Sequence, residues 1–246
     1  MNHAAAASFL LAAHRNGPGV PLPAGLLPAS ESDAYAIQRL CMAELGSIGG
    51  WKVGAAGPDA PPNCAPMPLA GLHPAPVSLP GAEFTTRDIE SEIAFVLAHD
   101  LPPRPAPYRR DEVMAAIGTC HPGIEVLQSR FLAEAEVDPL SNLADLIRHG
   151  AYVLGAAIPD WEALDFAAME VVQTIAGDTV RRRGNPAGDM IRLVQFLANV
   201  GAGWAGGLRA GQVVTCGSWT GKTPAPRRAE IDVSFTGAAP VRLRFV

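Results

Sequence analysis

The chain has 246 residues, 48% of them hydrophobic, and a formal net charge of −5 at pH 7. This length and apolar content suit one large domain, or one domain with a small helical appendage, and argue against disorder. An acidic balance without a long basic run argues against nucleic acid as the main partner. The cysteines form no C-x-x-C pair and predict reduced cytosolic thiols rather than a zinc site; they are Cys41, Cys64, Cys120 and Cys216.

Residues 1–50 are expected to form a helical segment that packs on the main domain. The apolar run 4–13 lacks a cationic flank and is shorter than the ~18 residues of a membrane span, so it predicts a surface or docking helix of a cytoplasmic protein. A connector rich in proline and glycine follows it. Ser30 and Asp33 then have the spacing of a capping box, which predicts a second helix that ends at Gly46.

Strands dominate the rest of the chain, residues 51–246, which we expect to be the catalytic domain. A helix is predicted from Asp111 to Cys120, ended by Pro122 and Gly123, and another opens at Asn185 and Pro186. Strands are predicted at 49–54, 87–97, 124–127, 151–157, 171–175 and 213–216, with a closing hairpin over 231–245. Irregularly interleaved helices predict an α+β fold with a curved or rolled mixed sheet.

Two glycine-rich stretches imitate nucleotide-binding motifs. Residues 201–206 match G-x-G-x-x-G, but a helix rather than a strand is predicted before them. Residues 217–223 resemble a P-loop that is one residue short, and Pro224 and Pro226 prevent the helix that a P-loop opens. Neither stretch supports nucleotide binding.

The strand 87–97 carries two carboxylates on one face. Side chains alternate along a strand, so Glu90 and Glu92 share a face, with Cα atoms about 6.6 Å apart. Like charges on an apolar strand cost several kcal/mol each to desolvate unless a positive group pairs with them. One alternative is a solvated face at the end of an edge strand. The other is that both carboxylates bind one cation.

Further polar residues interrupt apolar strands downstream and upstream. Glu125 is a third acid, and three carboxylates with water make a hard-oxygen site for Mg²⁺ or Mn²⁺. Lys52, between glycines in a short hydrophobic strand, is either the counter-ion of a glutamate or a proton-transfer group. The turn at Gly217, Ser218 and Thr220 offers hydroxyl and backbone N–H groups that suit a substrate carboxylate.

Four ordered motifs resemble the 2-keto-4-pentenoate hydratase branch of the fumarylacetoacetate hydrolase superfamily, and the similarity runs from about Ser8 to Phe245. The motifs are Gly50-Trp51-Lys52-Val53-Gly54, Glu90-Ser91-Glu92-Ile93-Ala94-Phe95-Val96-Leu97, Gly123-Ile124-Glu125-Val126 with Ser129-Arg130-Phe131, and Gly217-Ser218-Trp219-Thr220-Gly221.

This resemblance implies a mixed sheet rolled into an irregular barrel, a homo-oligomer, and a role in aromatic catabolism. It implies a divalent metal on Glu90, Glu92 and Glu125 that chelates the 2-oxo acid end of the substrate. It also implies that Lys52 handles protons and that the loop with Ser218 and Thr220 meets the substrate. The expected reaction is addition of water to a 2-hydroxy-2,4-dienoate, which gives a 4-hydroxy-2-oxo acid.

The chain departs from the pattern of this branch in two places. Leu146-Ile147-Arg148-His149-Gly150 replaces a polar Asn- or Ser-rich run, and no carboxylate lies between Asp59 and Glu83, where hydratases often supply a second acid/base residue. His149 or a hydroxyl of the 218–220 loop is a substitute for aiming the water, although each also has an ordinary structural interpretation. The alternatives are a 2-oxo acid decarboxylase, an acylpyruvate C–C hydrolase, and a non-catalytic protein that binds small acids.

Overall fold

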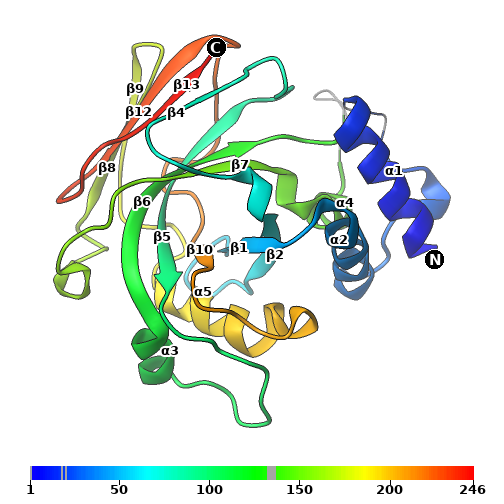
Figure 1. The fold of residues 1–246 in the computed structure, drawn as a ribbon, viewed down its shortest axis with the longest axis horizontal. Coiled ribbons are helices and arrows are strands. Elements are labelled where there is room, and N and C mark those ends of the chain that lie inside the picture. The colour runs from blue at the N-terminus through cyan, green and yellow to red at the C-terminus, as the bar shows by residue number, and fades with distance from the viewer. Residues whose placement is uncertain (1, 18, 20, 132–136) are drawn as a thin grey trace.

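Two mixed β-sheets pack face to face in the computed structural model, which describes residues 2–17, 19, 21–131 and 137–246 (Figure 1). The larger sheet has the order β2 (Asn63–Pro68), β1 (Ile48–Gly54), β10 (Val213–Thr215), β5 (Asp88–Leu97), β6 (Ile117–Leu127), β7 (His149–Leu154) and β3 (Leu72–Pro74), and β11 (Thr223–Pro224) also pairs with β5. The second sheet has the order β4 (Val77–Leu79), β13 (Val241–Phe245), β12 (Ala229–Phe235), β8 (Glu170–Ile175) and β9 (Asp178–Arg183).

The helices lie at the two ends of this arrangement. Three helices pack together beside the large sheet (Figure 1); they are α1 (His3–Asn16), α2 (Glu31–Leu45) and α4 (Pro139–Ala144). At the other end lie α3 (Arg110–Ala116) and α5 (Met190–Phe196). Ser30 caps α2 by accepting a hydrogen bond from the Asp33 N–H, as its spacing predicted. The N-terminal helices have a hydrophobic cluster of their own, but a division at residue 50 stays a prediction.

The main core lies between the sheets because apolar and polar residues alternate along strands such as β12 and β13, which turns the apolar ones inward. From β5 it takes Ile89, Ile93 and Phe95, all fully buried, and from the second sheet residues such as Ile231 and Phe245. β5 is paired on both sides, by β6 and by β10 and β11, so it is not an edge strand. Its second face is largely covered as well, because Glu92 and Ala94 on that face are buried and Glu90 is partly buried.

The predicted α+β class is confirmed, although both sheets are open, so an irregular barrel describes them only loosely. The closing hairpin is confirmed as β12 and β13. Among the described residues, no helix has the length and apolar character needed to cross a membrane. Met1, Pro18 and Val20, which belong to the predicted N-terminal segment, lie outside the described residues.

Two helix predictions need correction. The helix predicted through Cys120 ends at Ala116, and Pro122 lies within β6 instead of terminating a helix. The reason is tertiary: this stretch forms a long antiparallel ladder with β5, which outweighs a short helical pattern. The helix predicted to open at Asn185 begins at Met190, because Asn185 bonds the carbonyls of Cys216 and Gly217 and Asp189 supplies the cap.

Candidate metal centre

Three carboxylates converge where β5 and β6 pair. Glu90 lies directly opposite Glu125 in the ladder, and Glu92 lies opposite Gly123. One oxygen from each of the three glutamates lies within 4.8 Å of the others. Glu125 and Glu92 are 0% and 1% exposed, whereas Glu90 is only partly buried. The structure thus brings together the three acids that the sequence proposed, with Glu90 on the open side.

Lys52 reaches this cluster from β1, one strand beyond β10. Its Nζ donates to Glu125 Oε1 at 2.7 Å and to the carbonyl oxygen of Ile147 at 3.1 Å. The ammonium group is therefore the counter-ion of a glutamate, which was one of the two interpretations of its sequence context. Proton transfer by the same group stays a prediction.

His149, the first residue of β7, holds the same carboxylate oxygen. Its Nδ1 lies 2.9 Å from Glu125 Oε1. Burial lowers the pKa of His149 in spite of the neighbouring carboxylate, so the ring is neutral. We assign the proton to Nδ1, because a carboxylate only accepts. Glu125 Oε1 thus has two donors, and its other oxygen, Oε2, is buried without a hydrogen-bond partner among the described residues.

The segment before His149 has an unusual backbone. Leu146, Ile147 and Arg148 have φ angles of 53°, 50° and 61°, in the left-handed region that residues with side chains rarely adopt. Such conformations cost about 1–3 kcal/mol each and persist where surrounding contacts hold them. Here Lys52 binds the Ile147 carbonyl, and Arg130 donates to the His149 carbonyl at 2.6 Å. This backbone conformation places the Ile147 carbonyl at Lys52 and the His149 ring at Glu125.

Glu92 is held from the opposite side of the cluster. The Thr215 hydroxyl, on β10, donates to Glu92 Oε2 and lies 3.1 Å from the Tyr152 hydroxyl. Tyr152 needs the glycine at position 123, because a Cβ there would lie 2.1 Å from the Tyr152 hydroxyl oxygen. The glycine opposite Glu92 therefore makes room for the hydroxyl pair that orients this carboxylate.

The electrostatics of the cluster call for a cation. Burial raises the pKa of Glu90 to about 7 and that of Glu92 well above its ordinary value, and the other carboxylates add to both shifts. Burial also acts to raise the pKa of Glu125, but the Lys52 charge and the His149 hydrogen bond bring it below its ordinary value. Without a metal, the cluster would therefore retain protons.

The residues fit a divalent cation with a preference for oxygen ligands. The three converging groups are carboxylates, which suit Mg²⁺ or Mn²⁺. The Oε2 oxygen of Glu125 is buried without a hydrogen-bond partner among the described residues, and such an ion would supply the partner that it lacks. His121, four residues before Glu125, contacts Thr119 and the Gly155 carbonyl and belongs to no metal-ligating group found among the described residues.

The loop that was expected to meet the substrate runs along β5. Thr220 Oγ1 accepts from the Ser91 N–H at 3.1 Å and from Gln173 Nε2 at 3.2 Å, so this hydroxyl anchors the loop. Gly217 has a φ of 78°. The Ser218 hydroxyl is buried and has no hydrogen-bond partner in the described part of the chain. Ser218 thus has the unpaired hydroxyl of this loop in the described structure, whereas the Thr220 hydroxyl is already engaged.

Sequence reasoning missed the two hydroxyls that hold Glu92. Thr215 lies at the end of a short apolar strand, and Tyr152 lies within a longer one. A polar residue inside an apolar strand was the signal that identified Glu125, and it applies to both. Their contact with Glu92 depends on the pairing of β10 with β5, which the sequence does not reveal.

A cavity of about 700 Å³ opens beside the cluster. Its walls come from the start of β5, the segment before β7 and the loop after Gly221; the lining residues include Asp88, Arg148 and Lys222. Asp88 lies two residues before Glu90 on β5, and its side chain is therefore on the same face of the strand. The cavity thus lies next to the candidate metal centre along β5, although none of the three glutamates is among its lining residues.

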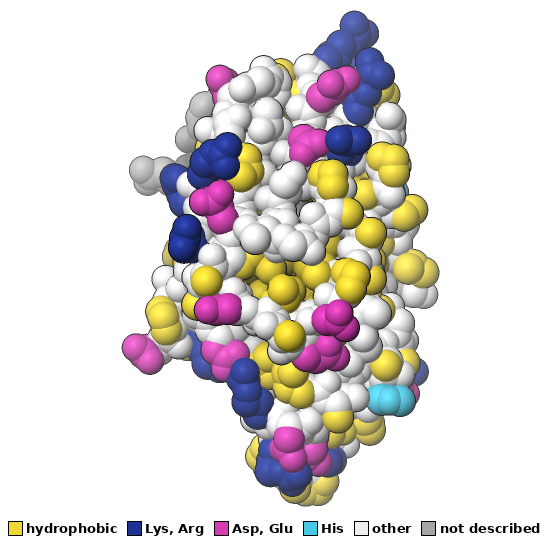
Figure 2. Space-filling model, turned by 90° about the vertical axis from the view of Figure 1, so that its left-hand side faces the viewer, with side chains coloured by type: hydrophobic (Ala, Val, Ile, Leu, Met, Phe, Trp, Pro, Cys, Tyr) yellow, Lys and Arg dark blue, Asp and Glu magenta, His cyan; other side chains and the backbone are white. Residues whose placement is uncertain are grey.

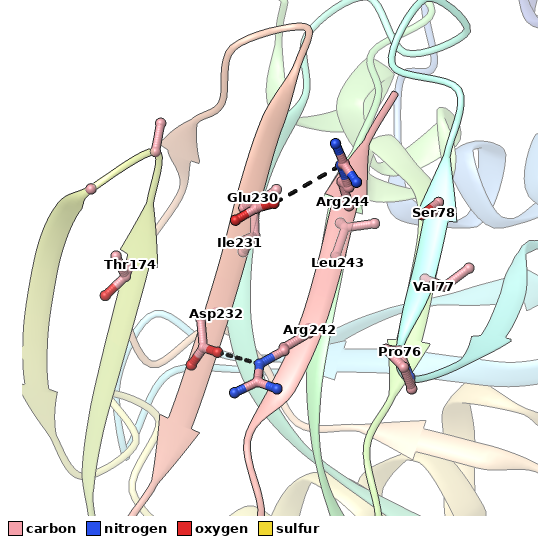
Figure 3. A pocket seen from close by; sticks show the side chains of 12 residues that line it. Pro76, Val77, Ser78, Thr174, Glu230, Ile231, Asp232, Arg242, Leu243 and Arg244 are labelled. Carbon is pink, nitrogen blue, oxygen red and sulfur yellow. Dashed lines mark hydrogen bonds and ion pairs between the residues drawn. The ribbon is translucent and has the colours of Figure 1, made fainter.

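A second hollow, of about 560 Å³, lies on the five-stranded sheet (Figure 3). Exposed ion pairs cross it from β12 to β13, with Asp232 and Arg242 2.8 Å apart and Glu230 and Arg244 4.0 Å apart. Figure 2 shows the side of the molecule on which β8 and β9 lie, where charges of both signs are interspersed. Exposed ion pairs of this kind contribute little to the stability of the fold. None of the three glutamates lines this hollow.

Comparison with known proteins gives a consistent picture. The model of the family "Fumarylacetoacetate (FAA) hydrolase C-terminal" matches residues 60–245. A 2-hydroxyhexa-2,4-dienoate hydratase from Comamonas testosteroni is 28% identical over 180 residues, 70% of this chain and 64% of the relative. A 4-oxalocrotonate decarboxylase from Pseudomonas putida is 28% identical over 137 residues, 55% of this chain and 52% of that relative. These alignments span less than two thirds of either relative.

The fold has a close counterpart among solved structures. The 4-oxalocrotonate decarboxylase of Pseudomonas putida G7, complexed with magnesium and adipate, superimposes with a TM-score of 0.85. The match covers 99% of this chain and 97% of the other at 24% sequence identity. At this identity the match establishes the fold.

Proposed function

This chain belongs to the fumarylacetoacetate hydrolase C-terminal family, and from that premise we propose a metal-dependent lyase that acts on a small 2-hydroxydienoic or 2-oxo acid. The proposed reaction adds water to a 2-hydroxy-2,4-dienoate and gives a 4-hydroxy-2-oxo acid, as in aromatic catabolism. The hydratase from Comamonas testosteroni supports this reaction. Glu90, Glu92 and Glu125 are the proposed metal ligands, and Mg²⁺ or Mn²⁺ is the proposed ion.

One observation carries the proposal: three glutamates converge, and the buried Oε2 of Glu125 has no partner among the described residues. A bound divalent ion would act as a Lewis acid on the oxygens at the 2-oxo acid end of the substrate. The magnesium in the related decarboxylase structure supports the same choice of ion.

The protein's own groups supply positioning and proton transfer. Lys52 Nζ is held by Glu125 and by the Ile147 carbonyl, and we propose that it moves the proton that converts the dienol to the unsaturated ketone. The unpartnered Ser218 hydroxyl and the backbone at Gly217 are proposed to hold the substrate carboxylate. The Thr220 hydroxyl is proposed to keep this loop in place rather than to bind substrate directly.

Decarboxylation of a 2-oxo acid is the second candidate, and the surroundings of His149 favour it. A hydratase needs a group to aim water at the distal carbon. Of the residues considered for that role, His149 uses Nδ1 to bind Glu125, and its side chain is buried, which keeps it from aiming a water of the open cavity. Decarboxylation needs no aimed water. The decarboxylase from Pseudomonas putida supports this candidate, because its sequence is 28% identical to this chain, as is that of the hydratase.

The deciding experiment follows the loss of dienoate absorbance with Mg²⁺ and identifies the products by mass. Gain of water supports hydration, whereas loss of CO₂ from an oxalocrotonate analogue supports decarboxylation. Cleavage of an acylpyruvate would identify a C–C hydrolase on the same site. Oxalate binding without turnover of any of these substrates would overturn catalysis and indicate a protein that binds small acids.

We also propose a cytoplasmic homo-oligomer. The four cysteines are all free and buried, which fits a reducing compartment.

A further inference from the structure

We propose that the cavity beside the metal centre is a subsite for an anionic group at the far end of the substrate, so that the substrate is a dicarboxylic acid. Arg148 and Lys222 would bind this second carboxylate. The inference rests on the proposed function, because it places the first carboxylate and the 2-oxo group at the glutamate cluster.

The cavity and the cluster are built from neighbouring residues of the same elements. Along β5, Asp88 lines the cavity and Glu90 belongs to the cluster, and both are partly exposed while Ile89 between them is buried. Arg148 lines the cavity immediately before His149, which contacts Glu125. A ligand whose head lies at the glutamates therefore extends its tail along the wall that Asp88 and Arg148 form.

The two cationic side chains come from separate elements and face one space. Arg148 belongs to the left-handed segment before β7, and Lys222 follows Gly221 in the loop that precedes β11. The pairing of Thr223 with Ile89 and of Pro224 with Asp88 fixes that loop against β5. This pairing holds the backbone next to Lys222, and the Gln128 N–H donates to the Arg148 carbonyl at 2.7 Å.

The charge balance of the cavity favours an anion. Arg148 Nη2 lies 3.3 Å from Asp88 Oδ2, so Asp88 neutralises one of the two cations and Lys222 remains in excess. The guanidinium carries five N–H donors, and Asp88 receives a hydrogen bond from one of its nitrogens. The side chain of Arg148 is 22% exposed, which removes it from bulk water without hiding it from a ligand. Charge-assisted hydrogen bonds are strongest in such sheltered places.

The size of the cavity also suits a substrate tail. Its volume of about 700 Å³ lies within the roughly 300–1,000 Å³ of small-molecule sites. Adjacent positions on one strand face, such as Asp88 and Glu90, are about 6.6 Å apart. A short unbranched diacid has ends separated on this scale, so it would reach from the cluster to the cavity wall.

The experiment compares two acids of equal chain length on the Mg²⁺-loaded full-length protein. Isothermal calorimetry would measure the affinities for 2-oxoadipate, which ends in a carboxylate, and for 2-oxohexanoate, which ends in a methyl group. We expect wild type to prefer the diacid by at least about tenfold. Arg148→Gln and Lys222→Gln should each reduce this preference, and the double variant should abolish it.

Two further variants control for indirect effects. Arg228→Gln removes an exposed arginine outside this cavity and should keep the full preference. Asp88→Asn combined with Arg148→Gln avoids leaving Asp88 unpaired and should reduce the preference as Arg148→Gln does.

Oxalate separates failure of this inference from failure of the proposed function. If wild type with Mg²⁺ does not bind oxalate, the 2-oxo acid site itself is wrong and the inference falls with it. If oxalate binds but the diacid and the monoacid bind equally well, the distal subsite alone is overturned. A diacid preference that survives in the double variant would also overturn the roles of Arg148 and Lys222, and this comparison needs no measurement of activity.

Discussion

Lys52 Nζ lies 2.7 Å from Glu125 Oε1, in a pair that joins residues on β1 and β6 across the intervening strands. The pair leaves the second oxygen of Glu125 buried without a partner among the described residues. One contact thus stabilises the ionised form of a proposed metal ligand and places an ammonium group beside the proposed substrate site.

Lys52→Met is expected to reduce both turnover and stability. Breaking a buried ion pair by removing one partner costs about 3–5 kcal/mol, so thermal unfolding of the metal-free protein should shift to lower temperature. Loss of proton transfer should lower kcat by at least about 100-fold. Lys52→Arg separates the effects, because it keeps the charge but remains protonated. If Lys52→Arg retains turnover, proton transfer by Lys52 is excluded.

Glu92→Gln should weaken metal binding. The substitution removes one ligand charge and keeps an oxygen that can accept from Thr215. We expect the affinity for Mg²⁺ to fall by at least about tenfold, measured by calorimetry with and without oxalate. Glu230→Gln, an exposed change on β12, is the matched control and should bind as wild type. Absence of Mg²⁺ binding to wild type under both conditions would refute the metal centre.

Metal affinity should depend on pH. The pKa of Glu90 is raised to about 7, and that of Glu92 lies well above its ordinary value, mainly because both groups are buried. A carboxylate must lose its proton to bind a cation, so protons compete with Mg²⁺ below these pKa values. Affinity in the absence of substrate should therefore rise with pH through about 7.

Proton release is the direct measurement of this competition. Calorimetry in buffers of different ionisation enthalpy should show protons released when Mg²⁺ binds near neutral pH. Equal affinity across this range without proton release would show that the glutamates are already ionised in the metal-free protein.

His149→Ala should lower metal affinity through Glu125. His149 donates to Glu125 Oε1, and loss of a hydrogen bond that orients a metal ligand typically costs about 10–100-fold in affinity. His149→Asn offers an amide N–H near the position of Nδ1 and should restore part of that loss. If both variants bind Mg²⁺ as tightly as wild type, the contact does not position the ligand.

Local patterns in the sequence were enough for many elements and for the choice of acids. Alternation along residues 87–97 placed Glu90 and Glu92 on one face and Ile93 and Phe95 on the core face, as the structure confirms. Alternation also identified the closing hairpin. It failed for residues 117–122, where pairing with β5 outweighs a helical spacing.

The site itself was decided by the tertiary structure. The sequence offered Glu125 and Lys52 as unpaired charges on apolar strands, because such charges need partners wherever the strands lie. Which partners they find depends on strand order and register, and these arise from contacts between distant parts of the chain. The ladder sets Glu90 opposite Glu125, β10 carries Thr215 to Glu92, and a left-handed turn brings His149 to Glu125.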